Sequence, residues 1–180
     1  MSKVTELKEE IKIPDAVDIT IEKNLITVKG EKGTLTKIMG HPNIVISKKD
    51  KILTFSCSNS PKRKEKALIG TFVAHIKNMI KGVTEGFTYK MKTVYSHFPI
   101  KTSVEDNQFI IQNFLGERSP RKAKILENVN VEVKGENVSV TGIDKEKVSQ
   151  TAANIERATR VKYRDIRVFQ DGVYIISKRG

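Results

Sequence analysis

The feature that most constrains the fold is an internal repeat, in which one order of short segments occurs twice, about 85 residues apart. Each copy holds two pairs of segments that alternate apolar and polar residues, followed by a segment with helical spacing. The alternating pairs cover residues 17–28 and 44–55 in the first copy, and residues 100–114 and 129–140 in the second. Because chance rarely repeats five elements in one order, the repeat predicts an α+β fold. We expect two similar domains from an internal duplication, each a small, mostly antiparallel sheet with one packed helix.

Apolar residues spaced three and four apart mark the two predicted helices. They are Leu68, Phe72, Val73, Ile76, Ile80 and Val83 in the first copy, and Val148, Ala152 and Ile155 in the second, with Asp144 as the expected cap. Gly82 is the expected end of the first helix. We therefore predict a first domain over residues 1–82 and a second over residues 83–180. Residues 1–10 are polar and are expected to form a loose or short helical arm, whereas residues 87–95 alternate as a strand.

Composition and charge narrow the class of protein. The chain has 33 Lys and Arg against 21 Asp and Glu, a formal charge of +12, which favours a polyanionic partner. No apolar run approaches the roughly 20 residues that cross a bilayer, and the polar N-terminus does not match a secretory signal, so we expect no membrane partner. Because Cys57 is the single cysteine, no intramolecular disulfide can form, and a reducing compartment is expected.

Arginine is distributed unevenly between the two copies. Seven of the eight arginines lie in the second half of the chain, and only Arg63 lies in the first. The guanidinium group binds phosphate through two parallel hydrogen bonds and stacks on bases, whereas the Lys ammonium group acts as a hydrated point charge. The asymmetry therefore predicts that the second domain makes the specific contacts with the polyanion. The lysines of the first domain are expected to supply only a general positive electrostatic field.

The densest basic stretch spans residues 157–167, at a helix end and beyond it. We predict that three segments bind RNA: this stretch, a basic loop and the C-terminus. The RNA-binding residues of the stretch are Arg157, Arg160, Lys162, Tyr163, Arg164 and Arg167. Those of the loop are Arg118, Arg121 and Lys122, and those of the C-terminus are Lys178 and Arg179. Tyr163 offers a stacking face. A secondary basic patch is expected at Lys62, Arg63 and Lys64, where cations oppose a helix dipole. The competing interpretation is a solvated helix end with ordinary ion pairs, such as Asp165 with Arg167.

The sequence carries no pattern typical of catalysis. The glycines of residues 29–33 lack the P-loop spacing, and the three histidines are scattered without metal-ligand spacing. Asp165 and Asp171 form only a weak carboxylate pair, and Asp171-Gly172 is interpreted as a turn. We therefore expect no enzyme, no cofactor, no metal and no small-molecule substrate. Aromatic residues make up 6% of the chain, which disfavours a broad single-strand platform and favours phosphate and shape recognition of folded RNA.

Several segments resemble one known family. They are Val28-Lys-Gly-Glu-Lys-Gly33, Gly82-Val-Thr-x-Gly-Phe-x-Tyr89, Tyr95-Ser-His-Phe-Pro99, Asn113-Phe-Leu-Gly-Glu-Arg118 and Val140-Thr-Gly-Ile-Asp-Lys-Glu-x-Val148, which continues through Gln150 to Glu156. Together they resemble the large-subunit ribosomal proteins numbered six in the bacterial scheme and nine in the eukaryotic one, over essentially the whole chain. Residues 164–172 differ from the Pro- and Gly-rich stretch of the bacterial branch, so the chain is similar to the archaeal and eukaryotic branch.

The resemblance implies a structural constituent of the large ribosomal subunit in the cytoplasm. It implies that the protein binds large-subunit rRNA mainly through its second domain, near the sarcin–ricin loop and the factor-binding region, and supports subunit assembly and translation beside neighbouring ribosomal proteins. The alternative is a basic protein–protein adaptor that does not bind RNA directly. A nucleic-acid hydrolase is disfavoured because no triad or metal cluster is evident.

Overall fold

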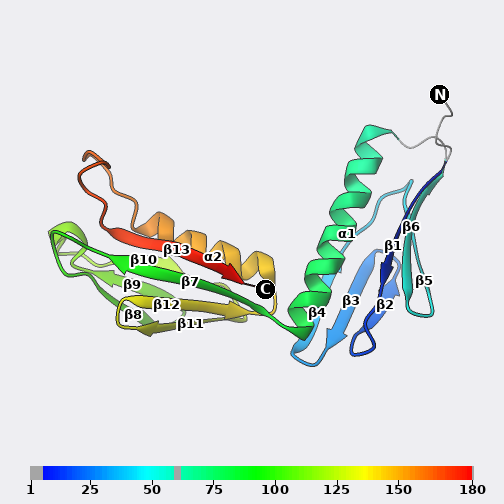
Figure 1. Ribbon diagram of the computed structural model, residues 1–180, viewed down its shortest axis with the longest axis horizontal. Coiled ribbons are helices and arrows are strands. Elements are labelled where there is room, and N and C mark those ends of the chain that lie inside the picture. The colour runs from blue at the N-terminus through cyan, green and yellow to red at the C-terminus, as the bar shows by residue number, and fades with distance from the viewer. Residues whose placement is uncertain (1–5, 59–61, 180) are drawn as a thin grey trace. The chain divides into compact units, whose positions relative to one another are not determined.

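The computed structural model describes residues 6–58 and 62–179, and it divides into two compact units, residues 1–85 (unit 1) and residues 86–180 (unit 2). Unit 1 contains β1 (Glu6–Lys12), β2 (Asp18–Glu22), β3 (Leu25–Gly30), β4 (Gly33–Ile38), β5 (Val45–Lys49), β6 (Ile52–Ser58) and α1 (Arg63–Thr84). Unit 2 contains β7 (Phe87–Val94), β8 (Lys101–Glu105), β9 (Gln108–Gln112), the short 3-10 helix η1 (Phe114–Gly116), β10 (Arg121–Lys124), β11 (Val129–Lys134), β12 (Asn137–Gly142), α2 (Lys145–Ala158) and β13 (Gly172–Arg179) (Figure 1).

Both units are built on the same plan, which confirms the predicted duplicated α+β fold. In unit 1 the strand orders are β1-β6-β5 and β2-β3-β4, and all pairs are antiparallel. In unit 2 the matching orders are β7-β12-β11 and β8-β9-β10, again antiparallel, and β13 is added beside β7. One helix follows the last hairpin of each repeat, as the sequence predicts.

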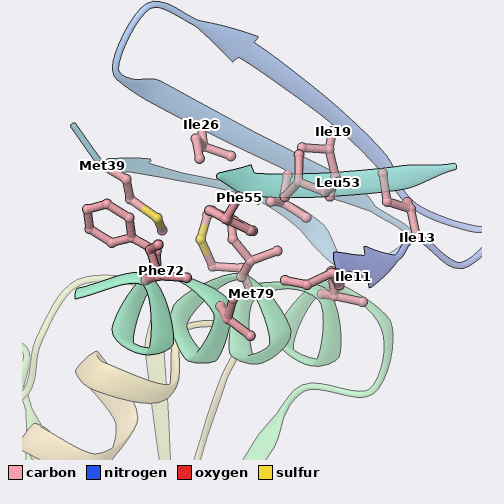
Figure 2. Close-up of a cluster of buried hydrophobic side chains, with 14 of the residues drawn as sticks. Ile11, Ile13, Ile19, Ile26, Met39, Leu53, Phe55, Phe72 and Met79 are labelled. Atoms are coloured by element: carbon pink, nitrogen blue, oxygen red, sulfur yellow. The ribbon is translucent and has the colours of Figure 1, made fainter. Parts of the chain in front are cut away.

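Each unit has its own hydrophobic core. In unit 1 the buried face of α1, including Phe72 and Met79, packs towards Leu53 and Phe55 of β6 and towards Ile26 of β3 (Figure 2). In unit 2 the helix α2 buries Val148, Ala152 and Ile155 in a cluster with β7, β9 and β12. Asp144 caps α2 as expected, because its Oδ1 accepts a hydrogen bond from the N–H of Glu146 at 2.9 Å. Cys57 is buried in the first core, as a small apolar side chain would be.

Three expectations about elements are wrong. Residues 6–12 form β1 and pair with β6, where the sequence predicted a loose arm; residues 1–5 of that arm lie outside the described residues. The helix α1 continues past Gly82 to Thr84, because Gly82 is a buried position of the helix and not its end. Arg121 begins the strand β10 instead of closing a basic loop. The strand β4, which completes the β2-β3-β4 sheet, was also not predicted.

Candidate nucleic-acid interface

Three segments of unit 2 meet at one end of its larger sheet: residues 95–100, 113–120 and 159–171, which together form the loop face. The pairing of Gly172 with Val94 places the first and last of these segments at the same sheet end. The rings of His97 and Phe169 stack with their centroids 4.6 Å apart, and a Cβ on Gly116 would lie 3.4 Å from the Phe98 ring. The loop face is therefore assembled from segments that are far apart in the sequence.

A buried carboxylate anchors the loop face. Asp171 has no exposed surface, and it accepts hydrogen bonds from the backbone N–H groups of Ser96 at 3.2 Å and His97 at 3.3 Å. Its Oδ1 also lies 3.0 Å from Nδ1 of His97, and because an ionised carboxylate can only accept, Nδ1 carries the proton. Burial alone would raise the pKa of Asp171, but the hydrogen bonds from His97 and Ser96 and the His97 charge bring it below its ordinary value.

The anchor extends to a predicted RNA-binding residue. The guanidinium carbon of Arg164 lies 4.8 Å from the centroid of the Phe169 ring, and the Phe169 ring also stacks on the ring of His97. Asp171, His97, Phe169 and Arg164 thus form a continuous chain of contacts from the buried sheet end to the surface. This chain restricts the position of an otherwise exposed arginine.

Arg121 has a different environment from that of a freely exposed arginine. Its Nε and Nη2 donate to the two carboxylate oxygens of Glu117 at 2.7 and 2.5 Å, and its Nη1 donates to the carbonyls of Ala158 and Arg160 at 2.9 and 3.0 Å. The same guanidinium lies 4.2 Å from the centroid of the Phe114 ring. These contacts join β10 to the C-terminal end of α2, where cations complement the helix dipole. Hydrogen bonding to Arg121 lowers the pKa of Glu117.

Arg167 forms the local ion pair that the sequence offered as the competing interpretation. Its Nη2 donates to Oδ2 of Asp165 at 2.8 Å and its Nε donates to Oδ1 at 3.1 Å. The side-chain hydrogen bond from Arg167 is the main cause of the lowered pKa of Asp165, and the same contact raises the pKa of Arg167. Asp165 therefore offsets part of the positive charge of Arg167.

Most of the other predicted residues are exposed on or beside the loop face. Arg118, Arg160 and Lys162 lie on its segments, Arg157 lies in the last turn of α2, and Lys122 lies on β10. Within the described part of the chain, the side chains of Arg118, Arg157 and Arg160 form no ion pair. Tyr163 is fully exposed and has a left-handed backbone with φ of +59°, so its ring projects from the loop. Ile166 and Val168 are exposed in the same loop.

The remaining predicted residues lie elsewhere. Lys178 pairs with Tyr89 and Arg179 with Thr88, at the end of β13 opposite to Gly172 and the loop face. Lys178 is exposed, and the side chain of Arg179 lies outside what the structure describes. Lys62, Arg63 and Lys64 are exposed at the N-terminal end of α1 in unit 1, where the N–H of Lys62 donates to Glu65 at 2.5 Å. The structure thus brings together the predicted RNA-binding residues between Arg118 and Arg167 but not those of the C-terminus.

Sequence reasoning missed the residues that hold the loop face in place. His97 and Asp171 are 74 positions apart, and neither has a neighbouring residue pattern that predicts the pair. Asp171 was interpreted as a turn residue, although it is the buried acceptor for two backbone groups. Among the described residues, no group of His, Cys, Asp or Glu has the arrangement of a metal site. No described helix is both long enough and apolar enough to cross a bilayer.

Comparison with known proteins decides the family. A family model described as Ribosomal protein L6 matches residues 13–86 and 98–172, one segment in each unit. The chain belongs to this family. A relative named "Large ribosomal subunit protein uL6" from Methanothrix thermoacetophila is 50% identical over 177 residues, which cover 98% of this chain and 99% of the relative. A relative of the same name from Methanobrevibacter smithii is 49% identical over 172 residues, which cover 96% of each chain.

These relatives confirm two predictions. Both come from archaea, in agreement with the predicted archaeal and eukaryotic branch of the Ribosomal protein L6 family. The family model and the relatives are ribosomal proteins and not enzymes. Membership of this family confirms the prediction that the chain is not an enzyme.

Proposed function

We propose that this protein is a structural constituent of the large ribosomal subunit in the cytoplasm and binds large-subunit rRNA through the loop face of unit 2. The names of the archaeal relatives support the subunit, and the exposed basic residues of the loop face support the RNA contact. From the family resemblance, the proposed location is near the sarcin–ricin loop and the translation-factor-binding region. Neighbouring ribosomal proteins are the other proposed partners, and the role is to support subunit assembly and translation.

The observation that carries this proposal is the anchored loop that presents the basic groups. Arg160, Lys162 and Arg164 follow the end of α2, and the contacts of Asp171 and His97 hold the same loop to the sheet. A loop whose backbone is already held in place loses less conformational entropy on binding, so a larger share of the attraction between its cations and phosphate appears as affinity. Arg118 adds a further exposed guanidinium from a second segment.

The mechanism is charge neutralisation combined with shape fit. Each phosphate that Arg or Lys neutralises releases condensed counterions, at roughly 0.9 per contact on duplex DNA. Tyr163 projects fully into solvent and is positioned to stack on an unpaired base. Arg121 supports this surface from within through Glu117 and the carbonyls at the end of α2, so its contribution to binding is indirect.

The salt dependence of binding to a large-subunit rRNA fragment tests the proposal. Five to eight phosphate contacts predict a slope of about −4 to −7 in log K against log salt concentration. A triple variant, Arg118→Ala, Arg160→Ala and Lys162→Ala, is expected to reduce the magnitude of the slope by about three. The charge-matched control is Lys29→Ala, Lys49→Ala and Lys66→Ala in unit 1, which is expected to leave the slope nearly unchanged.

A wild-type slope near −1 would contradict the proposed phosphate contacts. The adaptor alternative predicts a soluble complex with a protein that forms without RNA. Co-sedimentation with large subunits that survives moderate salt and is lost in the triple variant supports the RNA-binding role, whereas equal incorporation of the triple variant and the wild type opposes it.

A further inference from the structure

The described residues of unit 1 contain no counterpart of β13, the strand at the edge of the larger sheet of unit 2. In unit 1, Ile11 of β1 pairs with Leu53 of β6, and in unit 2, Met91 of β7 pairs with Val138 of β12, so β1 corresponds to β7. In unit 2, β7 lies between β12 and β13, whereas in unit 1 the strand order is β1-β6-β5 and β1 is at the edge. Among the described residues of unit 1, no strand occupies the position that β13 occupies in unit 2.

In unit 2 this position is part of the core (Figure 1). The strand β13 pairs antiparallel with β7 from Gly172 to Arg179 and packs against α2. Val173 of β13 is fully buried, and its N–H donates to Oγ1 of Thr159 at 3.0 Å. The duplicate therefore shows which kind of segment fits between the edge strand and the helix: an extended peptide that turns apolar residues towards the helix.

In unit 1 the corresponding place is an open groove of about 470 Å³. The residues that line it from β1 and α1 include Glu10, Ile11, Lys12, Lys77, Ile80 and Lys81. The buried side chains of Ile11 and Ile80 form an apolar floor, and charged residues surround it. The groove thus combines an open strand edge with an apolar floor, the two features that strand addition requires.

The backbone of β1 has hydrogen-bonding groups that point towards this groove. The N–H of Ile13 donates to the carbonyl of Lys51 at 2.8 Å, on the β6 side of the strand. Because successive residues of a strand point their backbone groups to opposite sides, the N–H and C=O groups of Glu10 and Lys12 point to the outer side. In unit 2 the N–H of Thr93 likewise donates towards the β12 side, to Glu136, and alternate groups of β7 face β13.

We propose that the outer edge of β1 binds an extended segment of a neighbouring ribosomal protein, added antiparallel to β1 as β13 is added to β7. This partner site goes beyond the RNA contact proposed for unit 2. The groove is matched to a peptide because the equivalent place in unit 2 holds the peptide strand β13, and because its lining carries charges of both signs around an apolar floor. The charged residues along β1 also discourage nonspecific pairing of an open edge.

A site-specific crosslink in assembled subunits tests the inference. Lys12 is replaced by a lysine analogue that carries a diazirine, and the full chain is incorporated into large subunits and irradiated. The expected product is a crosslink to one extended segment of a neighbouring protein. Glu10→Pro removes an outward N–H from an edge position, where proline is tolerated, and is expected to lower the crosslink yield at least tenfold. The matched control, Glu10→Ala, keeps the N–H and is expected to retain the yield.

Crosslinks to rRNA alone, no crosslink, or an equal yield in Glu10→Pro would each overturn the inference. If Glu10→Pro fails to fold, amide exchange of residues 6–13 in the Glu10→Ala chain replaces it. Exchange is expected to slow at least tenfold on incorporation, and an unchanged rate overturns the inference. Incorporation of the chain into subunits is scored separately, so a failure of this inference is distinguishable from a failure of the proposed RNA-binding role.

Discussion

Two arginines three positions apart have opposite roles in unit 2. The guanidinium of Arg118 is exposed, whereas the side chain of Arg121 is only 22% exposed and donates to Glu117 and to two carbonyls at the end of α2. Hydrogen bonds to charged groups contribute about 1.5–3 kcal/mol each when they are shielded from water, and less when exposed. The two residues can therefore be separated by measuring folding stability and RNA affinity independently.

We predict that Arg121→Ala lowers the free energy of unfolding by about 1–3 kcal/mol, because Glu117 and the carbonyls of Ala158 and Arg160 lose their donor. Urea denaturation measures this change. Arg118→Ala is expected to leave stability within about 0.5 kcal/mol and to reduce the magnitude of the salt slope of RNA binding by about one. The reverse pattern, with Arg118→Ala unstable and Arg121→Ala stable, would contradict this assignment.

The buried Asp171 predicts an acid-sensitive contribution to stability. Its folded-state pKa lies below the ordinary value of 3.8, so the ionised form is favoured in the folded state. This contribution is fully present above about pH 4 and decreases as the pH falls through the folded-state pKa. Asp171→Asn is expected to be less stable than the wild type at pH 6, and the difference should shrink in acid. Urea unfolding between pH 2 and pH 6 measures the difference, and a gap that widens in acid would refute the prediction.

At the scale of elements, the hairpins with clear alternation could be predicted, and the polar strands could not. Residues 6–12 have Leu7 and Ile11 as their only apolar positions, and a spacing of four is typical of a helix and not of a strand. They form β1 because they pair with β6, which lies 40 or more positions away, and such long-range pairing overrides local propensity. The strand β10 could not be predicted for a similar reason, because Ala123 is its one buried residue and the strand therefore shows no apolar alternation.

Close packing of β3 against α1 leads to a prediction for two glycines. A Cβ on Gly30 would lie 2.6 Å from Val83 Cγ2 and 2.9 Å from the Val83 carbonyl oxygen, so Gly30→Ala is expected to cost about 1–3 kcal/mol. Gly70 of α1 has no atom within 4 Å of such a Cβ, and Gly70→Ala is expected to stabilise the helix by about 0.5–1 kcal/mol. Thermal and urea denaturation of the two variants measure the changes, and equal stabilities would contradict the packing shown by the structure.

At the scale of the whole molecule, the repeat predicted the architecture because both copies bury apolar residues with the same periodicity. The candidate site was predicted only in part. Local sequence marked the exposed basic residues from Arg157 to Arg167, but the contacts that hold them depend on His97 and Asp171. The local sequence also could not predict that Lys178 and Arg179 lie away from the loop face, because their position depends on the direction in which β13 runs along β7.

Each unit has a separate core, so we predict that residues 86–180 fold alone and bind rRNA. The fragment is expected to show a cooperative unfolding transition and the salt slope of the full chain, to within about one. Circular dichroism and binding to the same rRNA fragment measure both. Residues 1–85, as the matched control, are expected to bind at least tenfold more weakly. If residues 1–85 retain most of the affinity, the loop face is not the main contact.

The pairing of β13 with β7 affects how the chain folds as it is synthesised. The described strands of unit 1 all precede α1, so this half can form its strand pairs before the second half has been translated. In unit 2 the first strand, β7, pairs with β13, which is translated after every other described element of that unit. A polypeptide released before residue 172 would lack Val173 and leave β7 exposed along one side. Termination before β13 would thus yield an aggregation-prone product, whereas a chain that includes β13 completes its second sheet.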